Sequence, residues 1–123
     1  MMDFGKPTGV LKQIGLPDSP MVMNKSDFNS SIQYKIKNSE IFQIPEQVMS
    51  NLPSYLDNPK KVIMLDDTKY LIEIEPKDVL KRSIIIETEV TPKGTILIPK
   101  VMEKDEFDKL LQKTWQNMVY ARQ

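Results

Sequence analysis

The chain has no cysteine and no histidine among its 123 residues. Without cysteine it can form no disulfide and carries no thiolate nucleophile or thiolate ligand. Without histidine it lacks the commonest general base, the commonest metal ligand and the usual pH switch. Asp66 and Asp67 could hold a hard cation, but adjacent aspartates between two strands are more typical of a turn. We therefore predict neither a metal site nor a cofactor.

Net charge and long apolar runs are also missing. Seventeen basic residues balance seventeen acidic ones, so no global field draws the chain to nucleic acid or to an anionic membrane. The sequence contains no apolar run long enough to span a bilayer and no signal-peptide core, so we expect no membrane partner. The four glycines are too scattered to cradle a phosphate. These features favour a cytoplasmic protein, or a virion-associated part of something larger.

Four short segments rich in β-branched, aromatic and aliphatic residues predict β-strands. Pro92-Lys93-Gly94 predicts a hairpin between the last two of them. The predicted strands are Val62–Leu65, Tyr70–Ile74, Ser83–Val90 and Thr95–Ile98.

Acidic residues alternate with apolar ones along the second and third predicted strands. We therefore expect one face of the sheet to be exposed to solvent and to carry Glu73, Glu75, Glu87 and Glu89. The opposite face is apolar and must pack against other elements. Two neighbouring carboxylates can divide acid and base roles between them. The pattern is nevertheless more typical of the solvated side of an antiparallel sheet.

Helical signals flank the strands on both sides. Glu103–Val119 is the clearest helix, with apolar residues at 3.6-residue spacing, and we expect it to cover the apolar face of the sheet with Trp115 in the core. Before the sheet, we predict helices over Thr8–Ile14, over Ser26–Lys37 and over Pro45–Leu52, a short turn after Pro53, and an edge strand at Pro20–Met23.

Taken together, these elements predict one α+β domain over residues 1–123. We expect N-terminal helices, followed by a four-stranded, mainly antiparallel sheet that packs against a C-terminal helix.

Several motifs resemble one known family. They are Gly5-Lys6-Pro7 with Val10-Leu11 and Gly15-Leu16-Pro17-Asp18, then Ile44-Pro45, Leu52-Pro53, Leu56-Asp57-Asn58-Pro59, Lys104-Asp105 with Phe107, and Tyr120. This series is similar to the phage-associated nuclease-like domains grouped with barnase, EndoU, the tRNase colicins and RelE. Those domains are found at the C-terminus of MuF-type phage head proteins and in large polyvalent proteins of mobile elements.

The resemblance implies metal-independent RNA cleavage on a fold of helices and an antiparallel sheet. Lys35 and Tyr120 match the family pattern, whereas Ile36 stands where the family has histidine. Lys100 and Met102 stand where it has a small hydroxyl residue and an aromatic one. The implied catalytic residues are Lys35, Lys100 and Tyr120. Their local basic charge makes Lys37 and the pair Lys81-Arg82 the candidate RNA-binding residues.

Metal-free cleavage of RNA requires a base for the 2′-hydroxyl proton, a donor for the leaving oxygen and cations against the phosphorane charge. Lysine and tyrosine titrate near ~10, so their base forms are rare at neutral pH. Our leading hypothesis is therefore a phage or mobile-element nuclease-fold domain with a degraded site that binds RNA or a partner protein, such as an immunity protein. The alternatives are an active, histidine-free endoribonuclease toxin, and a virion or morphogenesis interaction domain without a nucleic-acid role. The interpretation of Lys35 and Lys37 as solvated residues that complement a helix dipole also stays open.

Overall fold

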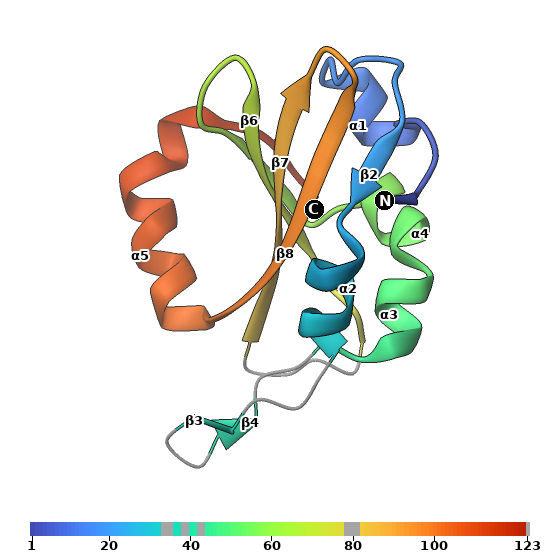
Figure 1. Cartoon of the computed structure of the whole chain (residues 1–123). Coiled ribbons are helices and arrows are strands. Elements are labelled where there is room, and N and C mark those ends of the chain that lie inside the picture. The colour runs from blue at the N-terminus through green and yellow to red at the C-terminus, as the bar shows by residue number, and fades with distance from the viewer. Residues whose placement is uncertain (33–35, 38–39, 42–43, 78–81, 123) are drawn as a thin grey trace.

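A single mixed sheet lies between two layers of helices in the computed structural model (Figure 1). Helix α5 (Lys104–Thr114) lies on one side of the sheet, and the four N-terminal helices lie on the other. Those four are α1 (Gly9–Gln13), α2 (Lys25–Ile32), α3 (Glu46–Ser50) and α4 (Leu52–Asp57). The structure describes residues 1–32, 36–37, 40–41, 44–77 and 82–122.

The sheet has seven strands among the described residues, so the prediction of a four-stranded sheet is wrong, although the broad α+β class is confirmed. All neighbouring strands are antiparallel except β2 and β8, which are parallel. In sheet order the strands are β1 (Met2–Asp3), β2 (Met21–Met23), β8 (Gly94–Glu103), β7 (Arg82–Thr91), β6 (Lys69–Ile74), β5 (Lys61–Met64) and β9 (Met118–Ala121). A separate pair joins β3 (Ile36–Lys37) to β4 (Glu40–Ile41).

The four predicted strands form the consecutive strands β8, β7, β6 and β5, and the three additional strands are short terminal segments. The sequence correctly indicates a strand at Pro20–Met23, but β2 is not an edge strand, because β1 pairs with its outer side. The sequence does not predict strands at the short segments β1 and β9. Their state is decided by the backbone groups of the neighbouring strand, which are distant in sequence.

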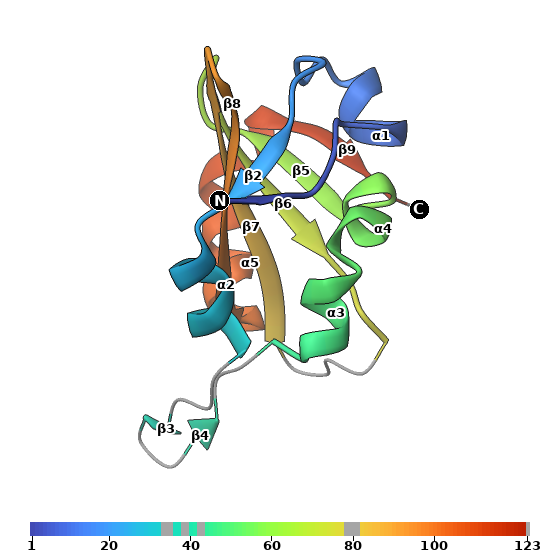
Figure 2. The same cartoon turned by 45° about the vertical axis from the view of Figure 1, so that its right-hand side comes forward.

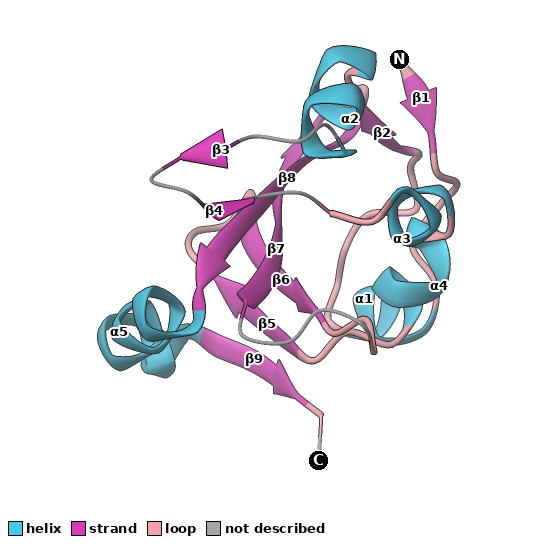
Figure 3. Ribbon diagram, turned by 90° about the horizontal axis from the view of Figure 1, so that it is seen from below, coloured by secondary structure: helices cyan, strands magenta, loops and turns pink. Residues whose placement is uncertain are grey.

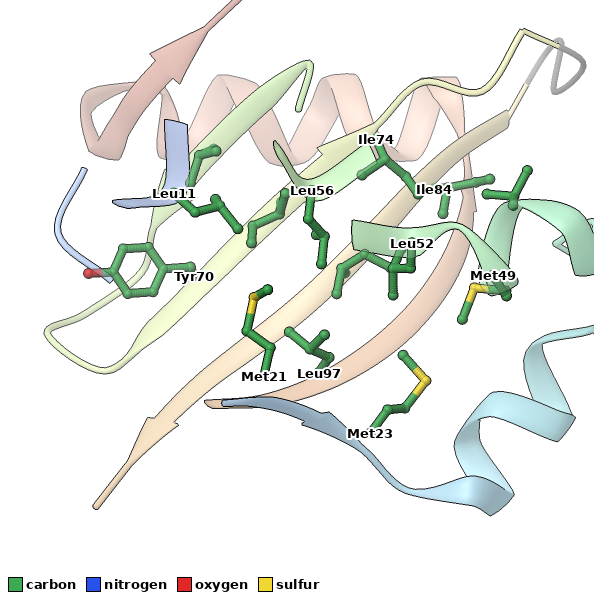
Figure 4. Close-up of a cluster of buried hydrophobic side chains, with 14 of the residues drawn as sticks. Leu11, Met21, Met23, Met49, Leu52, Leu56, Tyr70, Ile74, Ile84 and Leu97 are labelled. Atoms are coloured by element: carbon green, nitrogen blue, oxygen red, sulfur yellow. The ribbon is translucent and has the colours of Figure 1, made fainter. Parts of the chain in front are cut away.

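One face of the sheet packs against α1–α4 and forms the main core (Figure 4). Ile72, Ile84 and Leu97 from three adjacent strands lie on this face and are fully buried. The helices contribute Leu11, Met49, Leu52 and Leu56 to the same cluster. Burying a side chain of this size stabilises the fold by roughly 1.5–3 kcal/mol, so this cluster dominates the stability of the domain.

The opposite face packs against α5, and here the sequence prediction is wrong in two respects. Phe107 of α5 lies over Ile63, Leu71 and Ile85, so the helix covers the face that was expected to be wet, and α1–α4 cover the other. Glu73, which shares that face, is consequently buried. Because the Ile84–Ile86 run is apolar at every position, it already fits a strand that is covered on both sides.

The C-terminal helix is shorter than Glu103–Val119. It ends at Thr114, a 3₁₀ turn η1 (Trp115–Asn117) follows, and β9 then pairs with the outer edge of β5. Trp115 is 64% exposed, so the prediction that it lies in the core is wrong. In the sequence, apolar residues continue at helical spacing past Thr114. The backbone groups at the outer edge of β5 nevertheless need hydrogen-bond partners, and β9 supplies them by leaving the helix and pairing with β5.

The N-terminal predictions are mostly confirmed. Thr8 is the N-cap of α1, and Gly15 follows with a φ of +106°. The Thr8 hydroxyl does not cap the helix; it donates to Asp57 Oδ1 at 2.6 Å and so links α1 to α4. Helix α2 ends at Ile32, and Ile36–Lys37 is a strand, so the predicted helical end at Lys37 is wrong.

Gly94 allows β8 to begin directly beside the chain that leads into β2. Its φ is +153°, and a Cβ atom at this position would lie 2.9 Å from the carbonyl oxygen of Pro20. The same oxygen accepts a hydrogen bond from Thr95 N at 2.9 Å, so this carbonyl cannot move away freely.

We therefore expect Gly94→Ala to lower the free energy of unfolding by about 2 kcal/mol, through both the contact and the backbone strain. Gly5→Ala is the matched control, because Gly5 has a φ of +83° but open space around its Cβ position. It should cost about 1 kcal/mol from strain alone. Urea unfolding of the two variants tests this, and equal losses would show that the Pro20 contact is unimportant.

Candidate nucleic-acid interface

A polar cleft lies between α3, α4 and the segments that follow β6 and β9. Figure 2 shows α3, α4 and the chain leaving β6 on the same side of the molecule as the C-terminus. The cleft has a volume of about 500 Å³. It is lined by charged, amide, hydroxyl and aromatic side chains, together with Val48 and Pro76: Gln47, Ser54, Tyr55, Asn58, Glu75, Lys77 and Arg122.

An ion-pair network builds one wall of this cleft. Glu75 accepts from Lys60 Nζ at 2.6 Å and from Arg122 Nη2 at 2.9 Å. Arg122 also donates from Nη1 to the carbonyl oxygen of Asn58 at 3.2 Å, and its backbone N–H bonds Lys60 O at 2.8 Å. Arg122 is therefore held in place by both its backbone and its side chain.

These pairs also set the protonation states in the network. The hydrogen bond from Lys60 lowers the pKa of Glu75, and the charges of Lys60 and Arg122 lower it further. The bond to Glu75 in turn raises the pKa of Lys60. Lys60 and Glu75 are consequently charged at neutral pH, and Glu75 is a weak base.

Lys77 gives the cleft a cation that makes no ion pair with any described residue. It is exposed and follows directly after Pro76, which is buried. Among the described residues that line this cleft, two cations, Lys77 and Arg122, therefore accompany one carboxylate, Glu75, which also pairs with Lys60 outside the lining. The local balance is positive although the whole chain is neutral.

Tyr55 and the neutral polar side chains complete the cleft. Tyr55 is half-buried and packs against the main core, so its ring is held at the cleft wall by helix α4. Ser54 and Asn58 come from the same short helix and its C-terminal cap. The cleft therefore combines cations, an aromatic ring and neutral hydrogen-bonding groups within one hollow.

A buried carboxyl group lies close to this network on the α5 side of the sheet. Glu73 is 5% exposed, and burial raises its pKa, while Lys60, Lys61 and the Ser83 hydroxyl lower it by smaller amounts. Its Oε1 atom has no hydrogen-bond partner among the described residues. An unsatisfied carboxylate in such a place opposes folding.

The side chains of Arg82, Lys100 and Tyr120, which the structure describes, do not line the cleft. Lys35 and Lys81 lie outside the described residues, and Lys37 is described only as backbone in β3. Arg82 pairs with Glu103 at 2.9 Å, and Lys100 pairs with Glu87 at 2.9 Å.

Lys100 and Tyr120 lie far apart. Lys100 is on the α5 face of β8, opposite Ile85, whereas Tyr120 on β9 packs into the main core beside Val62. Strands β7, β6 and β5 lie between β8 and β9 in the sheet order, which corresponds to a separation of roughly 20 Å. Figure 3 shows these strands in that order. The structure therefore does not bring these two residues into one site.

Sequence reasoning missed most of the cleft. Lys77 and Arg122 carry no local signal in the sequence that points to this site. Tyr55 and Arg122 are 67 positions apart in the sequence. They meet because β9 returns along β5, and no local pattern encodes that pairing.

Comparison of the chain with protein-family models, with curated proteins and with solved structures finds no match. Across the described residues, no helix is long and apolar enough to cross a membrane. The same residues contain no cluster of three or more acidic side chains that could hold a metal ion.

Glu73 and Glu75 should have opposite effects on stability as pH changes. The folded-state pKa of Glu73 is raised, so its contribution to stability declines as pH rises through that value. Glu73→Gln should therefore raise the melting temperature at about pH 7 and lose this advantage near about pH 4.

Glu75→Gln is the matched control, because it makes the same chemical change two residues away. The folded-state pKa of Glu75 is lowered, so its contribution is present at neutral pH and is lost in acid. We expect a loss of about 0.5 kcal/mol at neutral pH, as is usual for exposed pairs. Thermal unfolding from acid to neutral pH checks both variants, and a destabilised Glu73→Gln at neutral pH would contradict the assignment.

Proposed function

We propose that this chain is a ribonuclease-like α+β domain of phage or mobile-element type that binds single-stranded RNA without cleaving it. The observation that carries the proposal is the cleft between α3, α4 and Arg122, which is lined by two cations, one carboxylate, a tyrosine and neutral polar side chains. The sequence motifs that resemble phage-associated nuclease-like domains support the same class.

The cleft has the parts that recognition of a single strand needs. Lys77 and Arg122 can contact phosphate oxygens, which supply most of the affinity in such complexes. A base that is not paired can stack on the ring of Tyr55. Gln47 and Asn58 can donate to and accept from base edges. A double helix, by contrast, would hide the base edges from a cleft of this size.

Binding is favoured over cleavage because the cleft offers no suitable base among its described residues. Glu75 is held ionised by Lys60 and Arg122, which makes it a poor proton acceptor. Glu73 has a raised pKa, but it is buried on the other face of the sheet. Lys100 and Tyr120 lie on opposite faces, so they cannot act on one phosphate.

RNA affinity should therefore depend on the cations of the cleft. We expect Lys77→Ala to weaken binding of a fluorescent single-stranded RNA, and to reduce the magnitude of the slope of log K against log salt by about 0.7. Arg122→Ala should do the same, with an added loss of stability because it also anchors Glu75.

Lys93→Ala is the control for these variants. Lys93 is also an exposed lysine, but it lies in the β7–β8 turn, at the opposite end of β7 from the cleft. In fluorescence anisotropy, the Lys93→Ala variant should bind the single-stranded RNA with the affinity and the salt slope of the wild type. Equal weakening by Lys77→Ala and Lys93→Ala would show diffuse charge attraction and would contradict a site at the cleft.

The wild-type chain should leave transfer RNA and ribosomal RNA intact during incubation with EDTA. This follows from the separation of Lys100 from Tyr120 and from the lowered pKa of Glu75. Gel analysis of the RNA ends is the measurement. Cleavage that leaves cyclic or 3′-phosphate ends, and that is lost in Lys35→Ala, would overturn the non-catalytic assignment and favour the active toxin.

A further inference from the structure

The carboxylate of Glu75 is shared between two cations, and each cation contacts a different oxygen atom. Arg122 Nη2 lies 2.9 Å from Oε1, and Lys60 Nζ lies 2.6 Å from Oε2. Arg122 lines the cleft, whereas Lys60 reaches the carboxylate from outside the lining. The pair between Arg122 and Glu75 can therefore open while the pair between Lys60 and Glu75 stays intact.

The position of the Arg122 guanidinium does not depend on Glu75 alone. Its Nη1 atom donates to the carbonyl oxygen of Asn58 at 3.2 Å, and the Arg122 backbone N–H donates to Lys60 O at 2.8 Å. Arginine has five N–H donors in one rigid plane, so Nη2 can change its acceptor while Nη1 keeps its own. An exchange of acceptor at Nη2 therefore needs no movement of the Arg122 backbone.

All three charged side chains are accessible to a ligand in water. The side chain of Glu75 is 46% exposed, and those of Lys60 and Arg122 are each 31% exposed. An ion pair of this exposure holds its two side chains together only weakly, because water screens the charges. A phosphate oxygen that enters the cleft can therefore compete with Glu75 for the same arginine donor.

The exchange has a cost that depends on Lys60. Once Arg122 turns to a phosphate, the carboxylate of Glu75 lies close to that phosphate, and two like charges at short range oppose binding. Lys60 lowers this cost because it still neutralises the carboxylate through Oε2. Without Lys60, the released carboxylate would have no cation of its own.

We propose that Arg122 exchanges Glu75 for a phosphate of the bound RNA, and that Lys60 is a positioning residue that keeps the released carboxylate paired. This inference rests on the RNA-binding role proposed for the cleft and adds the change inside the cleft that binding requires. It assigns opposite effects to the two members of one ion pair. Glu75 restrains RNA binding, and Lys60 assists it without touching the RNA.

A double-mutant cycle on Lys60 and Glu75 tests the exchange, with fluorescence anisotropy of the single-stranded RNA as the measurement. Glu75→Gln releases Arg122 in advance and should tighten binding about threefold, the scale of an exposed pair. Lys60→Ala should weaken binding about threefold, because the exchange then leaves an unpaired carboxylate beside the phosphate. In the Glu75→Gln background, Lys60→Ala should leave the affinity unchanged, as is expected of Lys93→Ala.

Glu46→Gln is the matched control for Glu75→Gln. Glu46 is an exposed glutamate of α3, next to Gln47 of the cleft, and it forms no ion pair with any residue that the structure describes. Its substitution removes the same charge near the cleft without releasing a cation, so the RNA affinity should stay that of the wild type.

Lys60→Arg is the rescue variant for Lys60→Ala. It keeps a cation beside Glu75 and should bind RNA as the wild type does. The hydrogen bonds that place Lys60 in the sheet, from its N–H to Glu73 O and from Arg122 N–H to its carbonyl oxygen, belong to the backbone. Neither substitution of the Lys60 side chain removes them.

Each contrary outcome overturns the exchange for a different reason. Weaker binding by Glu75→Gln would show that Glu75 holds Arg122 in place for RNA. An equal loss from Lys60→Ala in both backgrounds would show that Lys60 contacts the RNA itself. Equal gains from Glu75→Gln and Glu46→Gln would reduce the effect to general charge attraction.

Failure of the proposed function gives a different result from failure of the exchange. If neither the wild type nor Glu75→Gln binds the RNA, the RNA-binding role of the cleft is wrong, and the exchange is wrong with it. If both bind but the effects of Lys60→Ala and Glu75→Gln simply add, the cleft still binds RNA and only the exchange is overturned.

Discussion

The long hairpin of β7 and β8 is the constraint on which the rest of the structure depends. Each strand has ten residues, and they pair from Arg82–Glu103 to Thr91–Gly94 without interruption. Because Ile84–Ile86 is buried on both faces, this one hairpin holds the main core on one side and α5 on the other. Helix α5 follows β8 directly, so the hairpin also determines where the C-terminal layer begins.

The candidate cleft follows from how this sheet is covered. The layer of α1–α4 fills one face and leaves the polar cleft only beyond the end of β6, where Tyr55 and Arg122 meet. Helix α5 covers the other face only in part, so the part of β7 that carries Glu87 and Glu89 stays open. A chain without net charge therefore has two lysine and arginine side chains and one carboxylate lining the cleft beside α4, and balanced charges on the open part of the other face.

The candidate site shows where reasoning from the sequence stops. Lys100 is an exposed residue paired with Glu87, and Tyr120 packs into the main core beside Val62. Their residue types and their match to the family pattern therefore did not predict whether the two residues lie in one site. The cleft residues come from α3, from α4 with its C-terminal cap, and from the segments after β6 and β9. Contact between such distant segments depends on strand pairing, which residue patterns near each position do not specify.

By itself, the sequence determined the elements whose signal is local. The four central strands, the short strand β2, the turn at Gly94, the start of α1 after Thr8 and the amphipathic start of α5 follow from propensity and periodicity. Only the tertiary structure decided that β1 and β9 extend the sheet, that α5 covers the face carrying Glu73, and that Trp115 stays exposed. The physical reason is that these outcomes depend on which strand edges are free to pair and on which helices pack on each face of the sheet. Both depend on contacts between segments that are distant in the sequence.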